Sequence, residues 1–166
     1  MDALVLIREM LPNELESVGS LRVGAYEAQD LFASAGAYAP VLRSLGAGGG
    51  ATILVAVEDG ELLGTVMLQP WGPDSEIARD VEEIEMRALA VSPAAQGRGV
   101  GRALVDAAVS RARHQGHGRL VLFTQLAMRA AQRLYLAAGF ERLPDRDWSP
   151  LPGVVLLAFG LRLDDR

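Results

Sequence analysis

The residues with the clearest chemical potential form a glycine-rich loop, Gln96-Gly97-Arg98-Gly99-Val100-Gly101, with glycines at alternate positions. Residues 84–91 before it are largely apolar and stop at Ser92-Pro93, which is typical of a strand because proline cannot donate to a sheet ladder. A helical pattern follows the loop at once. The first N–H groups of a helix have no internal partner, and glycine lets a phosphate approach the backbone. The loop therefore predicts a site for a phosphate-bearing ligand.

The spacing of these glycines excludes two common phosphate sites. A Rossmann dinucleotide loop needs G-x-G-x-x-G, whereas the glycines here fall at 97, 99 and 101 and position 102 is Arg. A second glycine-rich run, at 46–50, precedes a strand pattern and lacks the Lys-Ser/Thr pair of a nucleoside triphosphatase loop. The phosphate therefore belongs to another kind of ligand.

Length and composition fit one globular domain spanning residues 1–166. Half of the residues are apolar, 22% are charged, and the net charge is −5. No cluster of Lys and Arg resembles a nucleic-acid footprint, so we expect no nucleic-acid partner.

The cysteine content and the hydropathy of the chain exclude several kinds of site and a membrane-spanning segment. The absence of cysteine excludes disulfides, thiolate metal sites and a cysteine nucleophile, and no cluster of metal ligands is apparent, so we expect no metal. No apolar run approaches the ~20 residues that cross a bilayer. We expect a soluble, cytoplasmic protein with no membrane partner.

Hydrophobic periodicity predicts the element order βααβββαβαββ. The Asp59-Gly60 turn predicts a β-hairpin, and residues 143–153, with three prolines, predict a loop. This order indicates an α/β (or α+β) fold in which about four helices flank a mixed sheet of about seven strands. The expected strands cover 3–8, 52–57, 62–69, 84–91, 120–123, a short segment from 140, and 154–163; the expected helices cover 13–29, 31–45, 100–112 and 127–138.

Two motifs together resemble the GCN5-related N-acetyltransferase (GNAT) superfamily. The acyl-coenzyme A (CoA) loop of that family has the pattern Gln/Arg-x-x-Gly-x-Gly/Ala, which Gln96 to Gly101 matches, and Leu89-Ala90-Val91 with Pro93 stands at the usual offsets before it. Ala131-x-x-Leu134-Tyr135-x-x-x-Gly139-Phe140 matches the second signature of the family. The resemblance extends over nearly the whole chain and implies the GNAT fold, with acetyl-CoA as co-substrate.

The resemblance implies specific contacts with the coenzyme. The loop N–H groups would hold its pyrophosphate, with Arg98 and Arg102 as charge partners. Backbone groups of Leu89 and Val91 would pair with the pantetheine arm as an added strand, and an N–H there would polarise the thioester carbonyl. The expected coenzyme-binding residues are Leu89, Ala90, Val91, Gln96, Gly97, Arg98, Gly99, Val100, Gly101, Arg102 and Tyr135. One departure is Met128, at a position where many members carry an Asn that bonds the pantetheine arm.

Acetyl transfer to an amine needs a proton acceptor, because an ammonium has no lone pair with which to attack. Glu83, Glu85 and Arg87 share the parity of Leu89 and Val91, so an unbroken strand would turn all five to one face. Several family members place their base at the position of Glu85 and others at that of Glu83. We prefer Glu85, and a role for both as solvated strand-end acids stays open.

Tyr135 occupies the general-acid position of the family, where it would stabilise the departing thiolate. The implied reaction is direct attack of a primary amine on acetyl-CoA. Two alternatives stay open, namely a non-catalytic module that binds or senses acyl-CoA and a transferase of a larger acyl group.

The sequence says least about the identity of the acceptor. Residues 74–85 hold six acids against Arg79, which would favour a cationic small-molecule or peptide amine if this run rims the cleft. Many family members form homodimers, and the sequence does not decide whether this chain does. The aromatic residues that we consider as walls of the acceptor site are Tyr26, Phe32, Tyr38, Trp71 and Trp148.

Overall fold

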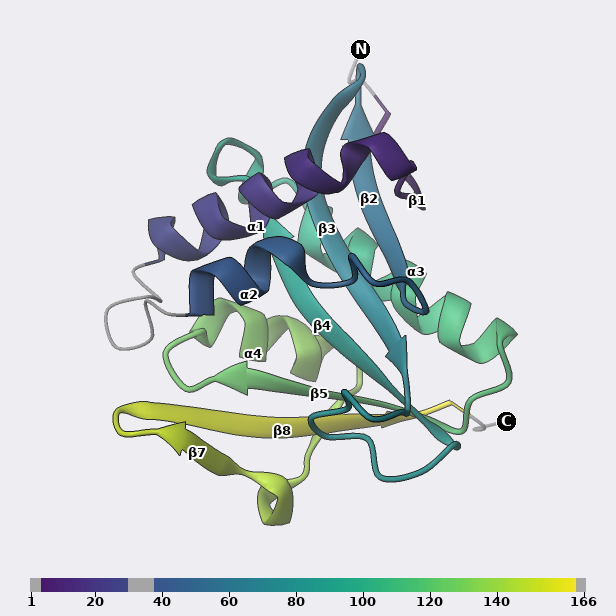
Figure 1. Cartoon of the computed structure of the whole chain (residues 1–166), viewed down its shortest axis with the longest axis vertical. Helices are drawn as coiled ribbons and strands as arrows, with labels where there is room; N and C mark the ends of the chain where they lie inside the picture. The colour runs from purple at the N-terminus through teal and green to yellow at the C-terminus, as the bar shows by residue number, and fades with distance from the viewer. Residues whose placement is uncertain (1–3, 30–37, 164–166) are drawn as a thin grey trace.

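The computed structural model describes residues 4–29 and 38–163, which form an eight-stranded mixed sheet with helices on both faces (Figure 1). This confirms the predicted fold class. The strands are β1 (Leu6–Glu9), β2 (Thr52–Glu58), β3 (Glu61–Pro70), β4 (Glu83–Val91), β5 (Arg119–Gln125), β6 (Glu141–Arg142), β7 (Trp148–Leu151) and β8 (Val154–Arg162). The helices are α1 (Leu15–Ala28), α2 (Tyr38–Ser44), α3 (Val100–His114) and α4 (Arg129–Ala137), with 3-10 turns η1 (Pro12–Glu14), η2 (Pro93–Ala95) and η3 (Pro144–Arg146).

The sheet has the order β1-β2-β3-β4-β5-β8-β6, and β7 pairs with β8. All neighbouring strands are antiparallel except β4 and β5, which are parallel. The predicted β2–β3 hairpin is confirmed, and its turn has φ values of 51° at Asp59 and 79° at Gly60. Positive φ at both turn positions matches the twist of the flanking strands.

Two apolar layers cover the sheet. In Figure 1, α1 and α2 lie in front of it, and α3 and α4 lie behind it. Leu104, Val105 and Ala108 of α3 are fully buried against strand residues such as Leu68 and Leu120. Val18 of α1 packs on the other face with the apolar side chains of β2 and β3. None of the helices in the described ranges is long and apolar enough to cross a membrane.

A buried arginine joins α1 to α2. Arg22 is fully buried, and its Nη1 donates to the carbonyl oxygens of Leu42 (3.2 Å) and Leu45 (2.8 Å). Burial lowers the pKa of Arg22 to about 10. Both acceptors lie at the C-terminal end of α2, where a helix leaves carbonyls without internal partners. Arg22 therefore holds α2 in place beside the sheet. The first part of the predicted 31–45 helix lies outside the described residues.

The prediction of an unbroken loop over 143–153 was wrong in part, because this segment contains η3 and β7. Trp148 pairs with Leu156, and Leu151 pairs with Val154. Proline cannot donate to a ladder, so Pro150 is tolerated in β7 because this strand pairs on one side only among the described residues.

β4 contains an irregularity that shapes the centre of the sheet. Against β3, Met67 pairs with Arg87 but Thr65 pairs with Ala90, so β4 holds one extra residue. Ala88 lies in this bulge with φ of 56°. Against β5, β4 pairs only from Glu83–Arg119 to Glu85–Val121, and beyond that point the two strands diverge (Figure 1).

We predict that Gly64→Ala destabilises the protein by about 1–3 kcal/mol, the usual cost of overpacking. A Cβ at Gly64 would stand 2.9 Å from the Ala90 carbonyl oxygen, 2.9 Å from Leu104 and 3.1 Å from Val100. The Ala90 carbonyl belongs to β4 and cannot move without moving the strand. Urea unfolding measures the effect. Gly48→Ala is the matched control, since a Cβ there would meet no described heavy atom within 4 Å. Equal unfolding midpoints for the two variants would contradict the prediction.

Candidate active site

A cleft of about 270 Å³ lies where β4 and β5 diverge. Its walls include residues 85–89 of β4 and 123–125 of β5. Tyr26 of α1, Tyr38 of α2 and Tyr135 of α4 also line it, together with residues of β7 and β8. Since α1 and α4 cover opposite faces of the sheet, the cleft reaches through the gap between the two strands.

Glu85 lines this cleft and is fully buried. Its Oε1 accepts hydrogen bonds from the backbone N–H groups of Ile77 (2.6 Å) and Ala78 (2.7 Å). Its Oε2 is buried and has no hydrogen-bond partner in the described part of the chain. A buried polar atom without a partner is costly, which makes this oxygen a candidate contact for a ligand. The two N–H donors fix the carboxylate so that Oε2 is the oxygen left for that contact.

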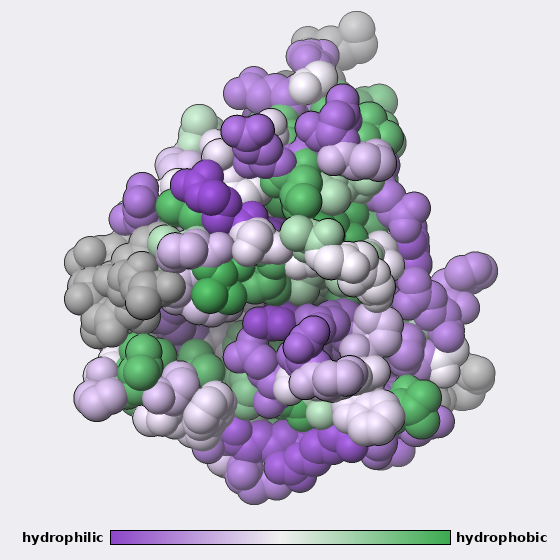
Figure 2. All heavy atoms as spheres, viewed as in Figure 1, coloured by the Kyte–Doolittle hydropathy of each residue, from purple (hydrophilic) through white to green (hydrophobic). Residues whose placement is uncertain are grey.

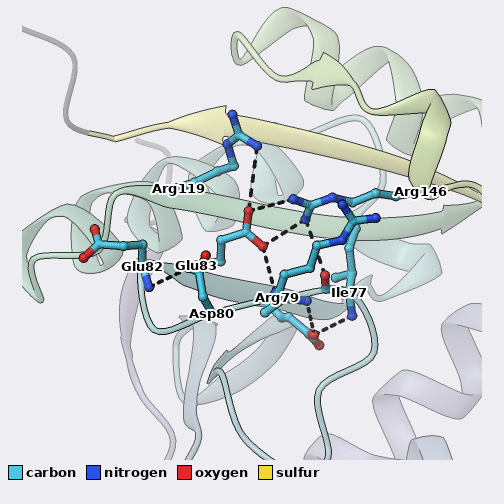
Figure 3. Close-up of polar contacts among 9 residues, drawn as sticks. Ile77, Arg79, Asp80, Glu82, Glu83, Arg119 and Arg146 are labelled. Carbon is cyan, nitrogen blue, oxygen red and sulfur yellow. Dashed lines mark hydrogen bonds and ion pairs between the residues drawn. The ribbon is translucent and has the colours of Figure 1, made fainter.

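Glu83 is held in a different environment, although it lies only two residues from Glu85. Arg146 of η3 donates to both of its oxygens at 2.9 Å, and the backbone N–H of Arg79 donates to Oε1 at 3.0 Å. Figure 3 shows the Glu83 carboxylate between Arg146 and Arg119, which stands 3.7 Å away. Burial by itself would raise the pKa of Glu83, but these bonds and charges together lower it. Glu83 does not line the cleft and serves to join β4 to η3.

Tyr135 enters the cleft from α4 with only 4% of its surface exposed. Its ring packs against Phe140 at 5.7 Å and Phe159 at 5.9 Å between centroids. Burial, with a smaller effect of the nearby Tyr26, raises the pKa of Tyr135. The phenol is therefore neutral at neutral pH and can donate a hydrogen bond into the cleft.

The expectation that Glu83, Glu85, Arg87, Leu89 and Val91 face one way was wrong. Leu89 and Val91 pack on the α3 side with Ile84 and Met86, whereas Ala88 packs with Tyr26 and Leu42 on the α1 side. The extra residue at the Ala88 bulge reverses the alternation, since a shift of one residue moves every later side chain to the other face.

The predicted phosphate loop joins β4 to α3. Gly97 and Gly99 both have φ of 79°, and a Cβ at either position would meet no described heavy atom within 4 Å. The first helical bond runs from Ala103 N–H to the Gly99 carbonyl at 3.0 Å, so the N–H groups before Ala103 precede the helical ladder. A Cβ at Gly101 would lie 3.3 Å from Leu134, the residue before Tyr135. The end of the loop therefore packs against α4, the helix that carries Tyr135 into the cleft.

Polar side chains of the loop make contacts that the sequence did not indicate. Gln96 donates through Nε2 to the Val91 carbonyl at 3.1 Å, which ties the loop to the end of β4. The two predicted charge partners are themselves paired, Arg98 with Glu58 and Arg102 with Asp106 at 3.0 Å. Ala90 is buried and pairs with Thr65 of β3.

Met128, the departure from the family pattern, caps the start of α4 and is buried with Tyr26 and Leu42. The Thr124 hydroxyl donates to its sulfur at 3.6 Å. Sequence analysis missed Phe123 as a cleft residue because it lies inside an apolar strand pattern, and missed Thr124 because the expected strand ended at residue 123. Arg146 was missed because it lies about 60 residues from Glu83 in the sequence, so no local spacing connects them.

The acidic run lies largely outside the cleft. Of its six acids only Glu76 and Glu85 line the cleft, and Glu76 forms an ion pair with Arg87. Among the candidate aromatic walls, Tyr26, Tyr38 and Trp148 line the cleft, Trp71 does not, and Phe32 lies outside the described residues. Within the described ranges, no three His, Asp or Glu residues come together as a metal site.

Comparison with known proteins identifies relatives of this arrangement. The sequence model of the acetyltransferase (GNAT) family matches residues 20–140. N-acetyltransferase 8 of Mus musculus is 32% identical over 93 residues, covering 56% of this chain and 40% of that protein. Mycothiol acetyltransferase of Cellulomonas flavigena is 35% identical over 96 residues, covering 55% and 27%. The chain thus spans less than half the length of these curated relatives.

A solved structure shares the fold over the whole chain. The structure of yncA from Salmonella typhimurium with its cofactor acetyl-CoA superposes with a TM-score of 0.71 at 20% identity. The match covers 99% of this chain and 96% of yncA.

We predict that Glu83→Gln destabilises the protein by about 3 kcal/mol near pH 7, the lower end for breaking a buried ion pair. The lowered pKa of Glu83 means that its charged form stabilises the fold above the unfolded pKa of about 4.3, and that this contribution is lost as the pH falls through the lower folded value. The stability difference between wild type and variant should therefore shrink below about pH 4. Denaturant unfolding across pH 3–8 measures it, and a difference independent of pH would contradict the assignment.

Proposed function

This chain belongs to the acetyltransferase (GNAT) family, and from that membership we propose that it transfers an acetyl group from acetyl-CoA to a primary amine. The observation that carries this proposal is that Glu85 from β4 and Tyr135 from α4 line the same cleft. An oriented carboxylate and a neutral phenol are the acceptor and donor that amide formation from a thioester requires.

Each residue has a definite role in the proposed reaction. Glu85, through Oε2, takes the proton from the attacking amine, so that the nitrogen lone pair can form the new bond to the acetyl carbon. The carbon–sulfur bond of the thioester breaks, and the coenzyme leaves as a thiolate. Tyr135 donates its hydroxyl hydrogen to that sulfur, and the second proton, which the nitrogen loses as it becomes an amide, returns the phenolate of Tyr135 to the phenol. The free edge of β4 at Leu89 to Val91 binds the pantetheine arm, and the N–H groups of residues 97–102 bind the pyrophosphate.

We expect Gly99→Ala to weaken CoA binding at least about tenfold, or about 1.4 kcal/mol. The added Cβ projects into the open space where the pyrophosphate would lie. Gly116→Ala is the matched control, because Gly116 has φ of 85° and equally open surroundings among the described residues. Gly116 follows the C-terminal end of α3, and this 15-residue helix separates it from Gly99 by about 22 Å. Calorimetric titration with CoA measures both variants, and equal affinities would exclude the loop as the pyrophosphate site.

We expect Glu85→Gln to lower kcat by about 10²–10⁴ and Tyr135→Phe by about 100-fold, the range for general acid–base groups. Glutamine keeps an oxygen for the Ile77 and Ala78 N–H groups, and phenylalanine keeps the packing against Phe140 and Phe159, so both variants should fold. Release of the CoA thiol measures turnover, and calorimetry with CoA serves as the control. Unchanged turnover in either variant would remove that residue from the mechanism.

A further inference from the structure

An apolar wall leads from Glu85 to the molecular surface. Ile77, whose N–H donates to Glu85, packs in one apolar cluster with Val121 and Phe123. The Phe123 ring in turn lies 6.5 Å from the Trp148 ring, tilted by 48°. Trp148 is 48% exposed in β7, and hydrophobic atoms are exposed where the β7–β8 hairpin turns (Figure 2). A ligand held at Glu85 would therefore lie along aromatic side chains on its way out.

The opposite wall is formed by Tyr26 and Tyr38. Burial raises the pKa of both phenols, so both are neutral at neutral pH. They add aromatic surface to the cleft and no charge.

The described residues that line the cleft include three charged side chains, Glu76, Glu85 and Arg87. Arg87 forms an ion pair with Glu76 and also donates to the Gln69 side-chain oxygen at 2.9 Å. These two charges therefore compensate each other. Glu85 is the remaining acidic side chain of the cleft, and its Oε2 has no partner among the described residues.

Building on the proposed acetyltransferase function, we propose that the acceptor is a primary amine with a single positive charge on an apolar body of aromatic size. One ammonium matches the one uncompensated carboxylate, and the apolar body matches the wall from Ile77 through Phe123 to Trp148. A second ammonium on a polyamine or an aminoglycoside would have to leave water against apolar side chains, which is strongly unfavourable without a partner.

The size of the cleft supports the same class. Its 270 Å³ lies just below the range of ligand pockets, about 300–1,000 Å³, and the acetyl thioester must share it with the acceptor. This space suits a small arylalkylamine better than a multi-ring aminoglycoside.

The test compares acceptors on the full chain by thiol release with acetyl-CoA. Phenethylamine should show a kcat/KM at least about tenfold above those of ethylamine, spermidine and kanamycin. Trp148→Ala should lower the ratio of phenethylamine to ethylamine activity at least about fivefold. Trp71→Ala is the matched control, because Trp71 is 51% exposed and does not line the cleft, and it should leave the ratio unchanged.

Failure of this proposal can be separated from failure of the proposed function. A preference for spermidine or kanamycin overturns the acceptor class and leaves the transferase intact. Absence of thiol release with every amine contradicts the transferase, and calorimetric titration of phenethylamine into the CoA-loaded protein then tests the acceptor class by itself. Binding that weakens in Trp148→Ala but not in Trp71→Ala supports the class. No binding, or binding unchanged in Trp148→Ala, overturns it.

Discussion

The candidate site depends on one interruption of the sheet. β4 and β5 share three register pairs and then diverge, while β4 stays paired with β3 and β5 stays paired with β8. The backbone edges that face the gap thus become available to a ligand, as an added strand would be. Through the same gap, Met128 and Ala131 at the start of α4 reach Tyr26 and Leu42 of α1 and α2. A regular parallel pairing of β4 and β5 would close the cleft and separate Glu85 from Tyr135 by the sheet.

The loop before β4 shows how neighbouring carboxylates acquire different chemistry. The backbone N–H groups of residues 77–79 donate in turn to Glu85, Glu85 and Glu83, so one short segment orients both side chains. Arg146 also reaches the Ile77 carbonyl, which secures this segment from the side of η3. Because Arg146 neutralises Glu83 alone, one carboxylate becomes structural and the other is left for a ligand. Such divergence between paired titratable groups is a common basis for dividing roles in active sites.

Sequence reasoning reached the local features of the site and missed the long-range ones. Alternate glycines before a helix and the Leu134-Tyr135 to Gly139-Phe140 signature predicted the loop and the helix that borders it, because both patterns are confined to short segments. The bulge carries no sequence signal, since alanine at positive φ is unusual and a glycine would have been the expected marker. Side-chain directions along β4 were consequently predicted incorrectly. The choice between Glu85 and Glu83 rests on Arg146, and β7 escaped detection because Pro150 argued against a strand.

The acidic run illustrates why charge counted along a sequence differs from charge presented to a ligand. Six acids within 74–85 suggested a site for a cationic amine, yet their carboxylates mostly accept hydrogen bonds from nearby N–H groups or pair with arginines. Asp80 accepts from the Glu82 N–H, Glu83 binds Arg146, and Glu76 binds Arg87. The loop packs on β5 and β8 through Ile77, and several of its N–H groups have no strand partner, so carboxylates accept from them. The density of acids therefore reflects the backbone of the loop, and the charge that a ligand meets in the cleft reduces to that of Glu85.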